Sequence, residues 1–184
     1  DKIGTVRTSR MIFADGAAAV VLGPAPAAAP PDLEAFQTYA SGPWSEVDSI
    51  IWPNPEFDNN ITVYGPEVKA LVKRYLAQMV TELSAMPHPE GPGSMLDAIE
   101  LIIPHQANRS MVATLAKAAG LNPDLLYFNI AQVGNTSAAS ILLAMHDAVR
   151  EGRIGRRMRV FAPGFGAGAV AGYLVMHVDP AVMA

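Results

Sequence analysis

The chain has 184 residues, 51% of them hydrophobic, with a net charge of −4 and a pI near 5.5. These values predict one domain with a large core and exclude the basic surface typical of nucleic-acid-binding proteins. The chain contains no cysteine, which excludes disulfides, thiolate metal sites and a cysteine nucleophile of its own, and we assign no metal ligands.

Sequence signals for the membrane and for secretion are missing. No apolar stretch reaches the roughly 18 to 20 residues of a spanning helix, and the N-terminus lacks the apolar core of a signal peptide. We therefore expect a cytoplasmic protein without a membrane partner.

The first 60 residues are predicted to hold strands and a linker. In "RMIFADGAAAVVLG", residues 10–23, apolar runs lie on both sides of Asp15-Gly16, which is typical of two strands around a turn. Residues 24–60 are rich in Pro, Asn and Gly and are predicted to form a linker with short strands around 36–39 and 50–51.

From residue 61 onward the pattern becomes helical and then alternating. Apolar residues at spacings of three and four from Val68 to Leu83 predict an amphipathic helix that begins near Pro66. Three strand segments follow, at 99–103, 125–130 and 159–163, with helices between them at 108–119 and 136–151, and 169–178 forms a final strand. This alternation predicts an α/β fold in which helices flank a sheet. Because no helix precedes the N-terminal strands, we expect that part of the fold lies outside this chain.

Polar or glycine-rich groups follow each of the three strands of this alternating region. They are "PHQAN" with His105, "QVGNTSAAS" with Asn135, and the glycine-rich loop at 164–168. In open α/β sheets, functional groups gather where strands end and helices begin, so these segments should converge. An imidazole, an amide and exposed backbone N–H groups are the parts of a site that stabilises a developing negative charge.

Each of these groups also has a purely structural interpretation. A histidine after an apolar strand is often a satisfied core residue, an asparagine before a helix is often an N-cap, and a glycine loop is often a tight turn. Their recurrence after three successive strands is what favours a functional site.

The motifs together resemble the second half of a β-ketoacyl-acyl-carrier-protein synthase III, of the thiolase superfamily. "PHQAN", "GNTSAAS" beginning about 30 residues later, "DGAAAVVL" and "GFGAGAVAGYLVMHV" carry this resemblance. It implies the C-terminal half of a thiolase-like αβαβα layered fold. Residues 1–60 would then be the last strands of the N-terminal half plus a linker, and 61–184 the C-terminal half.

The resemblance also implies a Cys, His, Asn triad in which His105 and Asn135 are two members. The cysteine, which accepts the acyl group from acyl-CoA, would belong to an N-terminal half outside this cysteine-free chain. A malonyl thioester would then lose CO₂ and attack the acyl group, with no cofactor. The backbone N–H of Ala167 would help to hold the acyl oxyanion, and Asn108 and Gly65 would bind the substrate arm.

Partners are implied as well: the N-terminal half, a second copy in a homodimer, and an acidic acyl carrier protein. Lys117 matches a basic docking position, whereas the arginine usual two residues after Asn108 is Ser110, with Arg109 displaced by one. A shift of one residue on a helix turns a side chain by about 100°. Arg109 and Lys117 are eight residues apart, which is a rotation of about 80° beyond two full turns, so we expect them to share a broad docking face.

Two other functions remain open from the sequence alone. One is an acyltransferase on the same scaffold, which would move the acyl group to a hydroxyl or amine without decarboxylation. The other is a non-catalytic partner subunit that completes a dimer. The presence of both His105 and Asn135 favours condensation, because acyl transfer needs a base but not two donors for an enolate.

Overall fold

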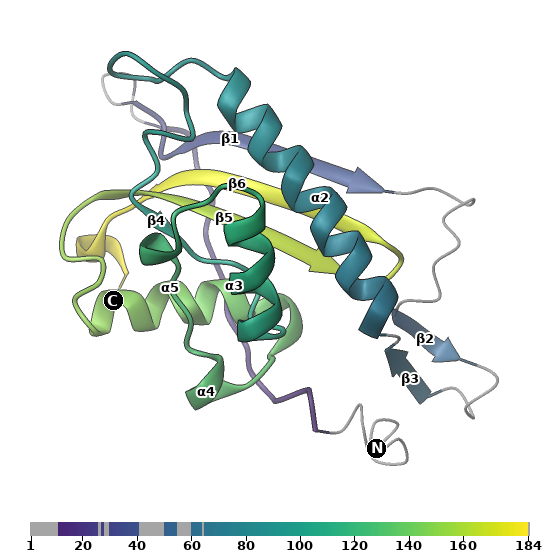
Figure 1. The fold of residues 1–184 in the computed structure, drawn as a ribbon. Coiled ribbons are helices and arrows are strands. Elements are labelled where there is room, and N and C mark those ends of the chain that lie inside the picture. The colour runs from purple at the N-terminus through teal and green to yellow at the C-terminus, as the bar shows by residue number, and fades with distance from the viewer. Residues whose placement is uncertain are drawn as a thin grey trace.

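The structure, a computed structural model, describes residues 11–25, 27, 30–40, 50–54, 60–63 and 65–183. Figure 1 shows a sheet with helices on both faces. The elements are β1 (Leu33–Ala40), β2 (Ile50–Asn54), β3 (Asn60–Val63), α2 (Gly65–Ala85), β4 (Leu101–Ile102), α3 (Arg109–Ala118), α4 (Ile130–Val133), α5 (Ser140–Arg150), β5 (Met158–Gly166) and β6 (Val170–Val178). Short 3₁₀ helices cover Pro123–Leu125, Ser137–Ala139 and Pro180–Val182.

The main sheet has the strand order β1-β6-β5-β4. β5 and β6 form a long antiparallel hairpin, β4 lies parallel to β5, and β1 pairs antiparallel with β6 at the other side. The β2–β3 hairpin is separate and lies beside the N-terminal end of α2 (Figure 1). The parallel pair places the segment after β4, which contains His105, beside the end of β5.

Two cores lie on opposite faces of the sheet, because the side chains of a strand alternate between faces. Phe161 of β5 faces the core made with α2 and α3, whereas Val160 and Ala162 face the core made with α5. The buried stripe of α2 follows the helical spacing that the sequence predicts: Val72, Tyr75, Leu76, Met79 and Leu83.

Most predicted elements are confirmed, with small shifts at their ends. The helix predicted near Pro66 is α2, and the one predicted at 108–119 is α3, with Asn108 as its N-cap. The helix predicted at 136–151 begins with a 3₁₀ turn and continues as α5. The strands predicted around 36–39, at 159–163 and at 169–178 are β1, β5 and β6, and the strand predicted at 50–51 begins β2.

The strand pair predicted around Asp15-Gly16 is wrong for the residues that the structure describes; Arg10 lies outside them. Phe13 makes a single bridge to Asn135, and residues 14–25 have no regular structure. Val21 is 95% exposed. A strand needs a neighbouring strand for its N–H and C=O groups, and none of the described strands lies beside this segment.

The strand predicted at 125–130 is also wrong. Residues Pro123–Leu125 form a 3₁₀ helix, Leu126 makes one bridge to Ile102, and α4 begins at Ile130. The apolar run satisfies its hydrogen bonds partly through β4, as when the Tyr127 N–H donates to the Ile102 carbonyl. A short apolar run does not by itself distinguish a strand from such a bridged segment.

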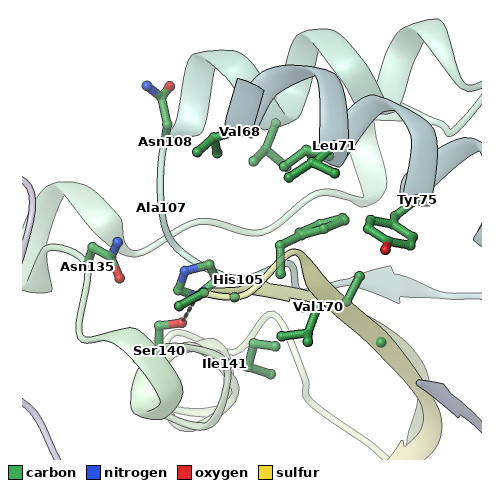
Figure 2. Close-up of a pocket in the computed structure, with 18 of the residues that line it drawn as sticks. Val68, Leu71, Tyr75, His105, Ala107, Asn108, Asn135, Ser140, Ile141 and Val170 are labelled. Carbon is green, nitrogen blue, oxygen red and sulfur yellow. Dashed lines mark hydrogen bonds between the residues drawn. The ribbon is translucent and has the colours of Figure 1, made fainter. Parts of the chain in front are cut away.

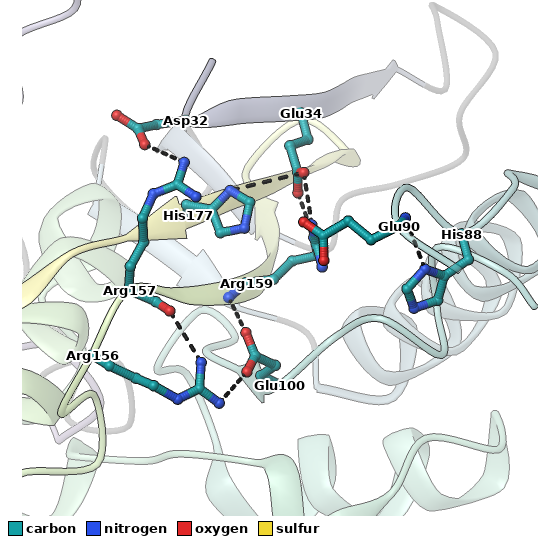
Figure 3. Close-up of polar contacts among 9 residues, drawn as sticks. All are labelled: Asp32, Glu34, His88, Glu90, Glu100, Arg156, Arg157, Arg159 and His177. Carbon is teal, nitrogen blue, oxygen red and sulfur yellow. Dashed lines mark hydrogen bonds and ion pairs between the residues drawn. The ribbon is translucent and has the colours of Figure 1, made fainter. Parts of the chain in front are cut away.

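Charged side chains tie β1 to the sheet at the end away from the glycine-rich hairpin turn (Figure 3). The Arg159 guanidinium is buried and donates to both carboxylate oxygens of Glu34, at 2.6 and 3.0 Å. It also donates to Glu90 at 3.1 Å. This ion pair crosses β6 and joins β1 to β5.

In the described ranges, no helix is both long and apolar enough to cross a membrane.

Candidate active site

The predicted site residues line one open pocket of about 1390 Å³. The pocket lies between α2, the N-terminal end of α3, the loop before α5 and the β5–β6 hairpin (Figure 2). Its lining includes His105, Asn135, Ala167, Asn108 and Gly65. The convergence expected from the strand ends is therefore present in the structure.

His105 lies directly after β4 and is held by backbone hydrogen bonds. Its N–H donates to the Pro163 carbonyl of β5 at 2.9 Å, and its own carbonyl accepts from Ala107. The neighbouring Gln106 is fully buried and links this segment to the chain before α4, because its side chain donates to the Pro104 carbonyl and accepts from the Asn129 N–H. The imidazole is therefore carried on a rigid backbone.

Among the described residues, the imidazole of His105 makes one side-chain hydrogen bond. Its Nδ1 lies 2.6 Å from Ser140 Oγ, and Ser140 is fully buried at the start of α5. Burial lowers the pKa of His105 to about 4, because desolvation disfavours the charged form. The ring is therefore neutral near pH 7 and carries a single N–H.

Asn135 lies between α4 and the 3₁₀ turn that precedes α5, and only 4% of its surface is exposed. Its Oδ1 accepts from the Ser137 N–H at 2.9 Å, and its backbone carbonyl accepts from the Ala14 N–H at 2.8 Å. The first bond fixes which end of the amide is the oxygen and leaves the NH₂ group as a donor. Figure 2 shows this amide and the His105 imidazole on the same part of the pocket wall.

Ala167 is in the turn that joins β5 to β6. Gly168 and Ala169 have positive φ values of 77° and 55°, whereas Ala167 does not. Alanine can therefore adopt the backbone conformation at this position, and its N–H can serve as the predicted donor. The turn is tied to α2, because the Tyr75 hydroxyl donates to the Ala169 carbonyl at 2.9 Å.

Asn108 and Gly65 line the pocket from the beginnings of two different helices, α3 and α2. Asn108 is the N-cap of α3, where its Oδ1 accepts from the Met111 N–H and the Ser110 hydroxyl, both at 3.0 Å. Its NH₂ group remains the donor end. Gly65 begins α2, and a Cβ added there would meet no atom within 4 Å.

Neither of the two predicted docking cations lines this pocket. The Arg109 guanidinium lies 5.7 Å from the centre of the Phe128 ring, and Lys117 lies in the last turn of α3. The cation in the lining is Lys69 of α2, which sequence reasoning missed. The sequence contains no signal for it, because the pocket position of its neighbour Val68 is known only from the structure.

Sequence reasoning also missed the roles of Gln106 and Ser140. Both are within the motifs that carry the resemblance, but a serine at the start of a helix is usually interpreted as a cap. No group of three or more His, Cys, Asp and Glu side chains that would hold a metal ion is present in the described part of the chain.

The chain is similar in sequence to proteins of known family. The family model for the C-terminal region of 3-oxoacyl-[acyl-carrier-protein] synthase III matches residues 92–178. The β-ketoacyl-[acyl-carrier-protein] synthase III of Coxiella burnetii is 36% identical over 175 residues, covering 94% of this chain and 52% of the relative. The enzyme of the same name from Yersinia pestis is 33% identical over 164 residues, covering 88% of this chain and 49% of the relative. The chain thus spans about half the length of these curated relatives.

Solved structures give the same answer. The 3-oxoacyl-(acyl carrier protein) synthase III of Pseudomonas aeruginosa has a TM-score of 0.78 at 28% identity, over 94% of this chain and 52% of that one. The synthase III of Aquifex aeolicus has a TM-score of 0.65 at 27% identity, over 80% and 44%. In sequence and in fold, the chain is similar to the C-terminal half of a β-ketoacyl-[acyl-carrier-protein] synthase III, and it has the thiolase-like α/β architecture that its motifs predict.

Proposed function

We propose that this chain is the C-terminal part of a condensing enzyme that joins an acyl group to a malonyl thioester by decarboxylative Claisen condensation. The observation that carries the proposal is that a neutral imidazole and an oriented amide lie on the same wall of one pocket. Two neutral donors suit an oxygen that gains negative charge only during the reaction, and one such donor contributes roughly 10² to 10³ in rate.

The proposed reaction has two stages. First, a cysteine thiolate on the N-terminal half takes an acyl group from acyl-CoA and releases the CoA thiol. Then the bond between the malonyl carboxylate and its α-carbon breaks, CO₂ leaves, and the electron pair forms an enolate. His105 and Asn135 donate to the enolate oxygen.

The enolate carbon then attacks the acyl carbonyl. This attack forms the new carbon–carbon bond, and the Ala167 N–H helps to stabilise the resulting tetrahedral oxyanion. When the oxyanion collapses, the carbonyl re-forms, the carbon–sulfur bond breaks and the cysteine thiolate is released. Since the electron pair comes from the broken carbon–carbon bond, the residues of this chain need not remove a proton from the extender. A histidine whose pKa is about 4 suits this role better than that of a base for acyl transfer to a hydroxyl.

The N-terminal half is the first proposed partner. Phe36 and Leu174 are neighbours across β1 and β6 on the same sheet face as the α5 core, and they are 68% and 40% exposed. Uncovered apolar side chains of this size mark an interface. In the complete enzyme we further propose a homodimer, an acyl carrier protein as donor of the extender, and a location in the cytoplasm.

The test separates the two stages in the complex of this chain with its N-terminal half. His105→Ala and Asn135→Ala are each expected to lower malonyl decarboxylation about 100-fold or more. Transfer of radiolabelled acyl groups from acyl-CoA to the cysteine should persist, because a helix N-terminus can activate that thiol. Equal loss of both stages would show that our assignment of these residues to decarboxylation is wrong. Undiminished decarboxylation would overturn the proposed function.

A further inference from the structure

Ser140 is the side chain that contacts the far nitrogen of the His105 ring. Its Oγ lies 2.6 Å from His105 Nδ1 and 3.3 Å from the backbone nitrogen of Gln106 (Figure 2). Ser140 has 0% exposure and lies at the first position of α5, where the helix backbone holds it. Its hydroxyl is therefore placed by the fold and is shielded from bulk water.

The hydrogen atoms at this contact can be counted. The Gln106 N–H can only donate, so one lone pair of Ser140 Oγ accepts it. The hydroxyl hydrogen then needs an acceptor, and the acceptor recorded for it among the described residues is His105 Nδ1. In the opposite arrangement Nδ1–H would donate to Oγ, and a fully buried hydroxyl hydrogen would have no partner. An unpaired buried donor is costly, so the first arrangement is favoured.

We propose that Ser140 is the positioning residue that fixes the imidazole of His105 in the tautomer with its hydrogen on Nε2, so that the ring presents a donor to the pocket. Nδ1, engaged with Ser140, is the acceptor. The proposal deepens the proposed function, on which its kinetic part rests, and it assigns a residue that acts through the His105 ring.

The tautomer decides which chemistry the ring can perform. With hydrogen on Nε2, His105 can donate to an enolate oxygen but has no lone pair in the pocket with which to remove a proton. With hydrogen on Nδ1, the same ring would be a base for acyl transfer to a hydroxyl. The low pKa of His105 agrees with a ring that stays neutral and carries one hydrogen. By setting the tautomer, Ser140 thus favours condensation over acyl transfer to a hydroxyl.

The direct measurement is the tautomer itself. The complex with the N-terminal half, labelled with ¹⁵N-histidine, is studied by NMR, in which protonated and unprotonated ring nitrogens have widely different chemical shifts. The signals missing in His105→Ala identify the ring among the four histidines of this chain and any in its partner. Hydrogen on Nε2 is the expected result, and hydrogen on Nδ1 in the unmodified protein overturns the proposal.

The kinetic measurement compares three variants. Ser140→Ala is expected to slow malonyl decarboxylation about tenfold, because the loss of one buried hydrogen bond changes an equilibrium by about that factor. Acyl transfer to the cysteine is expected to stay unchanged. Ser140→Thr keeps the hydroxyl and should restore decarboxylation. Thr136→Val is the control, because it removes a buried hydroxyl that has no hydrogen-bond partner among the described residues.

Each outcome has one meaning. Equal loss of both stages in Ser140→Ala, or no loss in either, overturns the positioning role. If Ser140→Ala does not assemble, the NMR result on the unmodified protein and the activity of Ser140→Thr still decide. If His105→Ala decarboxylates malonyl at the normal rate, the proposed function fails, whereas the tautomer remains measurable and is judged separately.

Discussion

The Tyr75 hydroxyl of α2 donates a 2.9 Å hydrogen bond to the Ala169 carbonyl, in the turn that also carries Ala167. Tyr75 is 5% exposed, and Ala169 has a φ of 55°, which a residue other than glycine rarely adopts. A bond between a helix on one face of the sheet and a strained turn at its end holds that turn in place.

We expect Tyr75→Phe to loosen this turn. Loss of the bond should lower the free energy of unfolding by about 1 kcal/mol and slow acyl transfer, because the Ala167 N–H is then less well placed. Urea denaturation and the acylation rate of the complex measure the two effects. Tyr173→Phe is the matched control, since its hydroxyl makes only a long 3.4 Å contact with Glu82 and should matter less.

Gly134 is expected to tolerate no side chain. Its φ of 72° and ψ of −168° lie in a region that is essentially restricted to glycine, and a Cβ there would be 2.8 Å from the Ala14 Cβ. Gly134→Ala should cost about 2 to 3 kcal/mol and displace Asn135, with loss of decarboxylation. In Gly152→Ala the φ is also positive at 73° but no atom lies within 4 Å, so about 1 kcal/mol and normal decarboxylation are expected. Equal effects of the two substitutions would show that the contact with Ala14 is unimportant.

The Glu34–Arg159 pair should make the free energy of unfolding depend on pH in the acidic range. Burial by itself raises the pKa of Glu34, but the hydrogen bond from Arg159 and the charges of His177, Arg159 and Arg157 outweigh it, so the pKa is below its ordinary value. The stabilisation is therefore complete above the ordinary pKa of a glutamate, and it is lost as the pH falls below that value and through the lower pKa of the folded protein.

Glu34→Gln tests this dependence. The variant should be less stable by about 3 kcal/mol at pH 7, because Arg159 is left buried without its main partner, and its stability should change less on acidification. Glu100→Gln, whose partner Arg156 is 68% exposed, should cost much less. Parallel pH profiles of Glu34→Gln and the unmodified chain, measured by denaturant unfolding of the complex, would contradict the prediction.

Residues 1–184 expressed alone are expected to be insoluble or molten. The apolar side chains Phe36, Val170 and Leu174 are exposed in this chain, and 51% of the residues are hydrophobic. Dye binding to exposed apolar surface and loss of the near-UV circular dichroism signal would identify a molten state. A soluble monomer with a cooperative thermal transition would be the contrary result.

Carrier docking is expected to depend on basic side chains near the pocket. Arg109→Glu and Lys117→Glu should raise the KM for carrier-bound malonyl, with little change for acyl-CoA, and the effect should fade at high salt. Lys69→Glu should have the larger effect, because Lys69 lines the pocket itself. Lys73→Glu, one turn further along α2, is the control. If the KM at low salt is unchanged in Arg109→Glu, Lys117→Glu and Lys69→Glu as well as in the control, an extender bound to CoA is favoured.

The sequence predicts elements whose pattern is local. The buried stripe of α2 repeats at three and four residues, and the N-cap Asn108 and Gly120 mark the two ends of α3, so each can be found within one segment. The strand predictions for two segments were wrong because a strand forms only where a neighbouring strand supplies its hydrogen-bond partners. Residues 14–25 and 126–130 have the composition of strands, but the described strands offer them only single bridges, through Phe13 and Leu126.

The site divides in the same way. His105 follows β4 as the sequence predicts, and it lines the same pocket as Asn135, although Asn135 follows α4 and not the strand predicted before it. Ser140 and Gln106 act through partners that the sequence does not specify: Ser140 contacts a ring 35 residues away, and Gln106 accepts from a backbone N–H 23 residues away. Such contacts follow from packing in three dimensions and not from spacing along the chain.

The pairing of β1 with β6 also sets an order for folding. β5 and β6 are joined by a short turn, so their hairpin closes a small loop, whereas the ion pair that fastens β1 to β5 joins residues 125 apart in the sequence. Closing a longer loop costs more chain entropy and slows the contacts that depend on it. We expect the hairpin to form first and β1 to dock last. During synthesis, β1 would therefore wait without its sheet partner until the ribosome had released β6.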